Sequence, residues 1–423
     1  MSQTRGCCAP LLLTLADPIT HRLGNGVDLV SLEIPEAPLV CLDFWCRAGS
    51  VFEAPSESGM AHFLEHMVFK GSEHLAPGEF DLQIEALVGN SNAATGFDDV
   101  HYHVLISPEA APRALDLLLD LVLTPRLEAQ AFAMERQVVL EELAQSEDQP
   151  EEVALQRLLE LACPEHPYSL PILGRRQALL GHAPDAMAAF HQRLYGAGRC
   201  VLAFSGAVQP SLVEQASLGP LAQLPPCCEP APLPGLKVKP GHHHLALPRL
   251  EAARLLMAWW QPAAPHLEAV IGADLATTVL AEGRRSRLVE RLREQLRVVE
   301  SIDLDLHTME CGSLALLEAV CGPEDLEEVR EAISSVWKDV MEQPIGQGEW
   351  ERARRLVSNS YRFGLEAPSG VAGLVGNARL WGRDPQLSAP LEMLQRWTPS
   401  RLQVEALASL DPERACVLEA VPA

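Results

Sequence analysis

The chain has 423 residues, of which 48% are hydrophobic, 21% charged and only 5% aromatic, a composition typical of soluble globular proteins. It is too long for one ordinary hydrophobic core, so two domains of roughly 200 residues are expected. The formal net charge of −24 argues against nucleic acid as a partner, and no apolar run approaches the roughly 20 residues that span a bilayer. We therefore expect neither a nucleic-acid nor a membrane partner.

Residues 1–17 are interpreted as an N-terminal extension. They contain one arginine and a short apolar stretch, so an export signal has to be considered. Pro10 interrupts that stretch, and no convincing small-residue cleavage site follows it. The 11 cysteines of the chain are scattered without any CxxC spacing, which fits reduced thiols better than a disulfide framework. These observations favour a cytoplasmic protein.

The stretch SESGMAHFLEHMVFKGS, residues 56–72, predicts a helix. No proline interrupts it, Ser56 or Ser58 can cap its start, and Gly71 can end it.

Within this helix lies HFLEH, which carries metal-binding side chains at helical spacing. His62 and His66 are one turn apart and point the same way, and Glu65 lies on nearly the same face. Neutral imidazoles are good zinc ligands, and a neighbouring carboxylate can take a proton from a water molecule. HxxEH is also the inverted form of the commoner HExxH zinc helix. Histidine pairs are common on helices, however, so a third ligand is needed, and an ordinary buried helix stays an alternative.

The next segments have the periodicity of a strand followed by a helix. SNAATGFDDVHYHVLI, residues 91–106, predicts a strand, and SPEAAPRALDLLLDLVL, residues 107–123, predicts an amphipathic helix. His101 and His103 share one face of this strand. They could approach a substrate groove, although partly buried histidines without a special role are the commoner explanation.

A third ligand is expected from the following helix, MERQVVLEELAQSED, residues 134–148. Glu135 and Glu142 are two helical turns apart and share one otherwise apolar face. Two such carboxylates are costly to bury unless a cation or metal pairs with them. Glu141 points about 100° away and is the weaker candidate. A solvent-facing charged helix is the alternative interpretation.

A proline-rich segment divides the chain into two parts. Residues 219–240 contain seven prolines, a density that excludes a regular helix and indicates a linker between residues 18–218 and 241–423. Just after it, His242–His244 have no acidic or cysteine neighbour in the sequence, so we expect no metal-binding role for them.

The second part repeats the pattern of the first. Strand-like residues 300–320 are followed by helical patterns at 322–341 and 348–365. The economical interpretation is an α+β fold of two homologous domains, each a mostly antiparallel sheet packed with helices.

The motifs together resemble the pitrilysin/insulinase family of zinc metallopeptidases. HFLEH is followed by ERQVVLEE, with Glu142 76 positions after His66. The blocks RAGSVFEAPSESGMAHFLEHMVFKGS, SNAATGFDDVHYHVLI, HPYSLPILG and LYGAGRCVLAFSGAV are also similar to family blocks. Within the family, the motif arrangement most resembles the short branch that includes mitochondrial processing peptidase. The resemblance is strong over about residues 18–218 and weak over about 250–420.

The resemblance implies a zinc site with defined roles. His62, His66 and Glu142 would bind one zinc ion per chain, and Glu65 would be the general base. Glu135 would orient a ligand histidine through its other ring nitrogen.

The resemblance also implies substrate-binding residues, with one departure. Asn92 and Ala93 would lie on an exposed edge strand that pairs with the substrate backbone. The second domain of the family carries an arginine and, seven residues later, a tyrosine that bind the substrate carbonyl. Counted from the stretch Ser286–Leu288, Arg293 matches the arginine, but Glu300 stands where the tyrosine is expected. A carboxylate cannot donate a hydrogen bond to a developing oxyanion and would repel it.

Two functions follow as hypotheses. The first is a zinc endopeptidase that hydrolyses extended peptides or unfolded segments, in a chamber between domains or subunits. The second is a structural subunit of the same family with little or no peptidase activity. Because Glu300 leaves the carbonyl-binding pair incomplete, we expect a homodimer or a heterodimer with a paralogous chain that supplies it.

Overall fold

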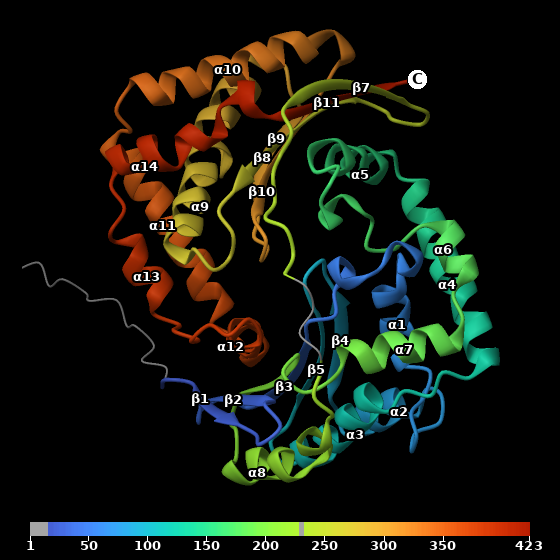
Figure 1. The fold of residues 1–423 in the computed structure, drawn as a ribbon. Coiled ribbons are helices and arrows are strands. Elements are labelled where there is room, and N and C mark those ends of the chain that lie inside the picture. The colour runs from blue at the N-terminus through green and yellow to red at the C-terminus, as the bar shows by residue number, and fades with distance from the viewer. Residues whose placement is uncertain (1–15, 228–231) are drawn as a thin grey trace, which may run out of the picture.

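Each half of the chain contributes one twisted sheet, helices cover both faces of each sheet, and the two halves lie one above the other (Figure 1). The computed structural model describes residues 16–227 and 232–423. Within this part, no helix is both long enough and apolar enough to cross a membrane.

The sheet of the first half has six strands, and one neighbouring pair runs parallel. All other neighbours are antiparallel. In spatial order the strands are β1 (Ile19–Arg22), β2 (Asp28–Glu33), β6 (Cys200–Gly206), β3 (Val40–Cys46), β5 (Val100–Ile106) and β4 (Asn90–Thr95).

The five-stranded sheet of the second half repeats this topology. Its one parallel pair, β7 and β11, lies at an edge of the sheet, and the other neighbouring strands are antiparallel. The first sheet has the same arrangement when its additional edge strand β1 is left out, because β2 and β6 then form a parallel pair at the edge. This agreement confirms the predicted α+β fold of two homologous, mostly antiparallel domains. In spatial order the strands are β7 (Gly241–Leu247), β11 (Cys416–Pro422), β8 (Ala253–Gln261), β10 (Ser313–Cys321) and β9 (Ser301–His307).

The helices supply the apolar faces that cover the sheets. The first half contributes α1 (Met60–Val68), α2 (Glu79–Ala86), α3 (Ala111–Leu123), α4 (Ala129–Glu147), α5 (Pro150–Ala162), α6 (Arg176–Gly181), α7 (Pro184–Leu194) and α8 (Pro210–Leu218). The second half contributes α9 (Leu267–Ala281), a π-helical segment (Val289–Leu296), α10 (Leu326–Glu342), α11 (Gln347–Gly364), α12 (Pro368–Leu380), α13 (Ala389–Leu394) and α14 (Pro399–Glu405).

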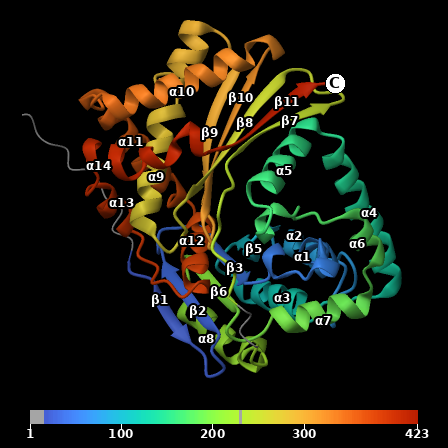
Figure 2. The same cartoon turned by 45° about the horizontal axis from the view of Figure 1, so that its top comes forward.

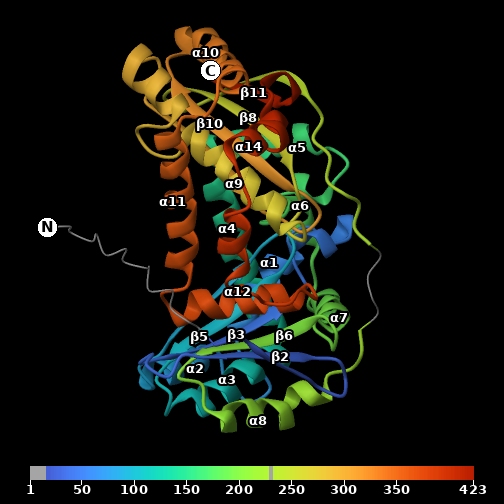
Figure 3. The ribbon, with the colours of Figure 1, turned by 90° about the vertical axis from the view of Figure 1, so that its left-hand side faces the viewer.

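The two halves exchange one helix each, which the sequence did not predict. α5 belongs to the first half but packs on β11 and β8 of the second sheet (Figure 2). α12 belongs to the second half but lies across β2, β6 and β3 of the first sheet (Figure 3). The chain therefore has two cores that contain residues from both halves, and these cores join the two halves.

The linker predicted at 219–240 stays a prediction. In its described parts, 219–227 and 232–240, the chain forms one 3-10 turn, Pro220–Gln223, and no α-helix. Backbone hydrogen bonds then tie it to both halves, from Leu236 N to Cys311 O at 2.8 Å and from Lys239 N to Ala162 O at 2.8 Å.

The single strand predicted for residues 91–106 is wrong, because the segment is a hairpin of β4 and β5. Gly96 N donates to Asp99 O at 2.8 Å and closes the turn between them. The turn is also bound from outside, since Ser50 N donates to Gly96 O at 3.2 Å. The glycine in the middle of an alternating pattern was the signal for this turn.

The predicted serine cap of the HFLEH helix is also wrong. α1 begins after Gly59, whose φ of 83° lies in the left-handed region, and no side chain at that position caps the helix. Instead, the Glu53 carboxylate accepts hydrogen bonds from Gly59 N at 2.9 Å and Ala61 N at 2.8 Å. Burial raises the pKa of Glu53 to about 7. A half-buried carboxylate outside the helix thus satisfies the amides that a serine was expected to satisfy.

Candidate metal centre

Two packed helices bring the three predicted ligands together. Phe63 of α1 contacts Phe132 of α4 with ring centroids 4.6 Å apart, which holds the two helices side by side. His62 Nε2 lies 3.7 Å from Glu142 Oε1, and His66 Nε2 lies 3.4 Å from Glu142 Oε2. One ligand atom from each residue lies within 4.8 Å of the others. Two imidazoles and one carboxylate therefore converge on a single point.

The spacing and chemistry of this cluster fit a zinc ion. Ligand atoms about 2.1 Å from a tetrahedral zinc lie about 3.4 Å from one another. Burial, together with the neighbouring His66, lowers the pKa of His62 to about 4, so this imidazole is neutral and has a lone pair to donate. The side chain of Glu142 is 42% exposed, which leaves the solvent side of the cluster open for a fourth ligand.

Glu135 lies behind the cluster and orients one ligand. Its Oε1 is 2.9 Å from His66 Nδ1, so the Nδ1 hydrogen is donated to the carboxylate and Nε2 keeps its lone pair on the side of Glu142. Its Oε2 is 2.8 Å from Lys70 Nζ. Sequence reasoning missed Lys70, although it follows His66 by one helical turn on the same face.

Glu65 is held next to the ligands without belonging to them. The Thr95 hydroxyl at the end of β4 donates a hydrogen bond to Glu65 Oε2. Burial raises the pKa of Glu65 above its ordinary value, although the Thr95 hydroxyl and His66 act in the opposite direction. Thr95 was also missed. It stands three positions after Asn92 in the block that resembles the family, which was the available signal.

The predicted substrate strand lies at an edge of the sheet. β4 pairs with β5 on one side, ends the strand order on the other, and contacts α1. Asn92 is exposed, and its side-chain oxygen accepts a hydrogen bond from the backbone N–H of Ala93 at 3.0 Å. Both residues are therefore close to the zinc helix on a strand with one unpaired edge.

Arg293 and Glu300 are not brought to this cluster. Arg293 is exposed in the π-helical segment Val289–Leu296, which packs on α10 and β9. Glu300 is exposed just before β9, and its backbone N–H donates to Val320 O at 2.8 Å. Both residues belong to the edge of the second sheet at β9, away from α1 and α4.

Two further groups of metal-binding side chains occur in the described residues. Asp43 lies with His101 and His103, and Glu419 lies with His242 and His244. The expectation that His242–His244 lack an acidic partner is therefore wrong. Glu419 Oε1 is 2.7 Å from His242 Nε2, and Glu419 Oε2 is 3.0 Å from His244 Nδ1. The partner comes from the neighbouring strand β11, about 175 positions later in the sequence, so sequence proximity could not find it.

Comparison with known proteins places the chain in a family. The model for insulinase (peptidase family M16) matches residues 29–176, and the model for the M16 inactive domain matches residues 183–357. An uncharacterized zinc protease of Mycobacterium tuberculosis is 27% identical over 402 residues, 92% of this chain and 90% of the relative. The β subunit of the mitochondrial processing peptidase of Lentinula edodes is 33% identical over 195 residues, 46% of this chain and 42% of the relative.

A solved structure shows the same fold. The crystal structure of a protease from Helicobacter pylori superposes with a TM-score of 0.88 at 23% identity and covers 96% of this chain and 100% of its own. The repeated sheet topology, the HxxEH helix with its distant glutamate and both family matches lead to one conclusion. The chain belongs to the pitrilysin/insulinase family of zinc proteases, peptidase family M16.

Proposed function

We propose that this protein is a zinc-dependent endopeptidase that hydrolyses extended peptides or unfolded segments. The observation that carries the proposal is the convergence of His62, His66 and Glu142 within 4.8 Å, with the Glu65 carboxylate held beside them. The names of the relatives support zinc protease chemistry in the family.

The residues of this chain divide the chemistry between them. Zinc, when held by His62, His66 and Glu142, supplies a Lewis acid for the peptide carbonyl and lowers the pKa of water. Glu65 takes the proton from the attacking water and returns it to the leaving amine. Its burial supports this role, because a carboxyl whose pKa is raised toward the working pH both accepts and returns a proton readily. Thr95 keeps the carboxylate in place for both transfers.

β4 is the proposed docking strand for the substrate. Its free edge can pair with an extended peptide backbone, which gives binding that depends little on the side chains of the substrate. Because α1 contacts β4, a peptide paired at Asn92 and Ala93 would pass close to Glu65.

Arg293 and Glu300 support the proposal that the active form is a dimer. Neither residue lies at the zinc cluster of its own chain, and Glu300 cannot donate a hydrogen bond to an oxyanion. One relative is named as a subunit of a processing peptidase. We propose that a second chain supplies the carbonyl-binding groups: a paralogous chain would bring both the arginine and the tyrosine, whereas a second copy of this chain would bring Arg293 alone. The arrival of the second chain would close the chamber in which peptides are cleaved.

The alternative is a structural subunit without catalysis. The name of the second matching model, M16 inactive domain, and the glutamate at position 300 favour it. The complete ligand cluster and the held Glu65 favour the peptidase.

The test is the variant Glu65→Gln in the zinc-loaded protein. The amide cannot accept a proton, so the variant should keep about one zinc per chain and its fold, yet lose hydrolysis of an unstructured peptide. Glu141→Gln is the matched control, since Glu141 is an exposed carboxylate next to a proposed ligand. Normal turnover by zinc-loaded Glu65→Gln would exclude Glu65 as the base. Full zinc content in both His62→Ala and His66→Ala would place the metal elsewhere.

A further inference from the structure

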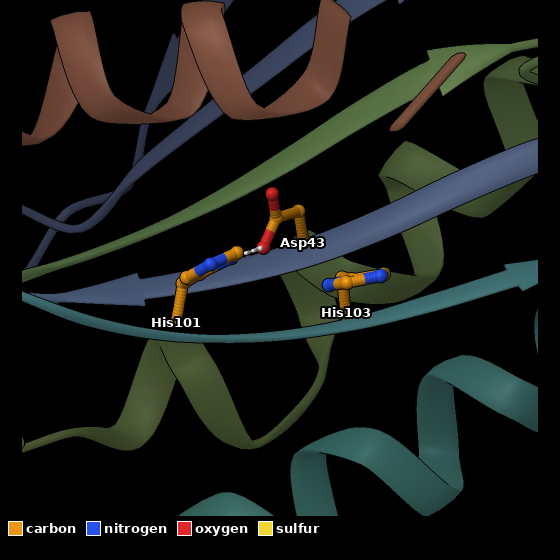
Figure 4. Close-up of side chains that lie close together, drawn as sticks. All are labelled: Asp43, His101 and His103. Carbon is orange, nitrogen blue, oxygen red and sulfur yellow. Dashed lines mark hydrogen bonds and ion pairs between the residues drawn. The ribbon is translucent and has the colours of Figure 1, made fainter. Parts of the chain in front are cut away.

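A second cluster of metal-binding side chains lies on the first sheet, on the face opposite its main core (Figure 4). Asp43 comes from β3, and His101 and His103 come from β5. Asp43 stands directly opposite His103 in the strand register, and His101 is two positions along the same face. One ligand atom from each lies within 4.8 Å of the others. The strand pairing therefore builds this group, with no contribution from loops.

The surroundings hold these side chains in place. His101 is stacked on Trp45 with ring centroids 4.2 Å apart and an angle of 13° between the rings. The ring of His103 lies parallel to that of His101, with centroids 5.7 Å apart. The Asp43 carboxylate is almost wholly buried, and its Oδ1 lies 3.0 Å from His101 Nδ1. A buried carboxylate is costly unless a cation is near it, so the cluster already favours positive charge.

Both imidazoles of the cluster are partly exposed to solvent. α12 passes over this face and presents Gly373, which has no side chain, to Asp43; a Cβ added there would lie at van der Waals distance, 4.0 Å, from Asp43 Oδ2. The side chain of His101 is 23% exposed and His103 is half-buried, so solvent reaches both rings. The negative charges of Asp99 and Glu65 also act on His101.

We propose that Asp43, His101 and His103 form a second binding site, for a divalent transition metal such as zinc. Two imidazoles and one carboxylate suit Zn²⁺ and its transition-metal neighbours rather than Mg²⁺ or Ca²⁺, which prefer oxygen ligands. The ion takes the place of the hydrogen shared by His101 Nδ1 and Asp43, so one proton leaves for each ion that binds there. Because that hydrogen bond has to be given up, the site binds metal more weakly than the cluster of His62, His66 and Glu142.

The proposed second metal site lies close to the strand proposed to bind the substrate. His103 pairs across the sheet with Asn92 of β4, so a bound ion would lie one strand inward from the edge proposed to receive the substrate. The binding site itself does not depend on the proposed peptidase activity and is tested without it.

The experiment removes the ligands His62 and His66 and measures the metal binding that remains. His62→Ala/His66→Ala protein, stripped of metal, is titrated with Zn²⁺ by calorimetry and with Co²⁺ by visible absorption, which reports the ligand set. We expect one Zn²⁺ ion per chain whose binding depends on His103, and no binding of Mg²⁺ at this site. Adding His103→Phe keeps an aromatic ring at this position but removes the nitrogen ligands. The loss of affinity should exceed the roughly 10- to 100-fold that loss of an outer-shell partner costs.

Two controls keep the result specific. Adding His242→Gln/His244→Gln to the same background removes the cluster at Glu419 and should leave the ion bound. Asp43→Asn should weaken binding as His103→Phe does, and circular dichroism checks that each variant is folded. In the otherwise unchanged protein loaded with zinc, His103→Phe should abolish binding of one additional Zn²⁺. Binding that survives His103→Phe, or that disappears with the His242 and His244 substitutions instead, would overturn the proposal.

Discussion

At the scale of single residues, Glu135 shows how a buried carboxylate is matched to its partners. Its side chain is only 8% exposed, and its two oxygens face His66 and Lys70. The lysine supplies the positive charge that burial requires, while the histidine is held in the tautomer that leaves Nε2 free. The proposed zinc ligand His66 is thus held by a residue that is not itself a proposed ligand.

We predict that Glu135→Gln weakens zinc binding by about 10- to 100-fold, the range expected when an outer partner of a ligand histidine is lost. The neutral amide accepts a weaker hydrogen bond from His66 and leaves Lys70 without a counter-charge. Zinc affinity is measured by competition with a chromophoric chelator, and Glu141→Gln on the same helix serves as the control. Equal affinities for the Glu135→Gln variant and the parent would show that His66 needs no such support.

At the scale of elements, the exchanged helix α12 depends on close contact with the first sheet. A Cβ at Gly376 would lie 2.6 Å from Trp45 Cδ1 and 3.1 Å from the Cβ of Ala203. Glycine is therefore the residue that lets this helix reach the sheet. Gly373, one turn earlier, has more room, since its added Cβ would lie no closer than 3.9 Å to Trp45.

These two glycines make a matched pair for a stability test. Gly376→Ala should lower the free energy of unfolding by about 1–3 kcal/mol, because overpacking forces the helix and sheet apart. Gly373→Ala should be neutral or stabilising by up to about 1 kcal/mol, because alanine favours helix and meets no clash. Urea denaturation of the metal-free variants measures both changes. Equal effects of the two substitutions would mean that α12 does not pack on Trp45 as described.

At the scale of the whole molecule, the residues proposed to bind the substrate carbonyl are separated from the proposed zinc ligands. Arg293 and Glu300 lie at the β9 edge of the second sheet, whereas the proposed ligands lie between α1 and α4 of the first half. Within a single chain, this pair therefore brings no oxyanion donor to the proposed zinc site. A second chain is the simplest source of one.

We predict that the isolated chain hydrolyses peptides weakly. A paralogous chain with the arginine–tyrosine pair should raise turnover by about 100- to 1,000-fold, because the loss of one oxyanion donor usually lowers turnover by that factor. In a homodimer, Glu300→Tyr should recover part of this increase in turnover. Adding Arg293→Ala to the Glu300→Tyr variant should abolish the gain. Turnover is measured together with the oligomeric state by light scattering. Full activity of a monomer that Arg293→Ala leaves unchanged would exclude this division of labour.

The local periodicity of the sequence was enough to predict the fold class and the residues that share a helical face. Alternation with period two and periodicity near 3.6 indicated strands and helices, and their repetition predicted two homologous α+β domains. The spacing within HFLEH and from Glu135 to Glu142 predicted which carboxylates and imidazoles share a helical face. These features could be inferred because helix geometry relates residues three, four and seven apart whatever surrounds them.

Only the tertiary structure decided which distant residues meet. Glu419 joins His242 and His244, and Asp43 joins His101 and His103, because neighbouring strands set a register that sequence distance does not reveal. The exchange of α5 and α12 follows from burial, since each sheet has a second apolar face that its own half leaves uncovered. Such pairings depend on the packing of whole elements against one another, and no local period encodes them.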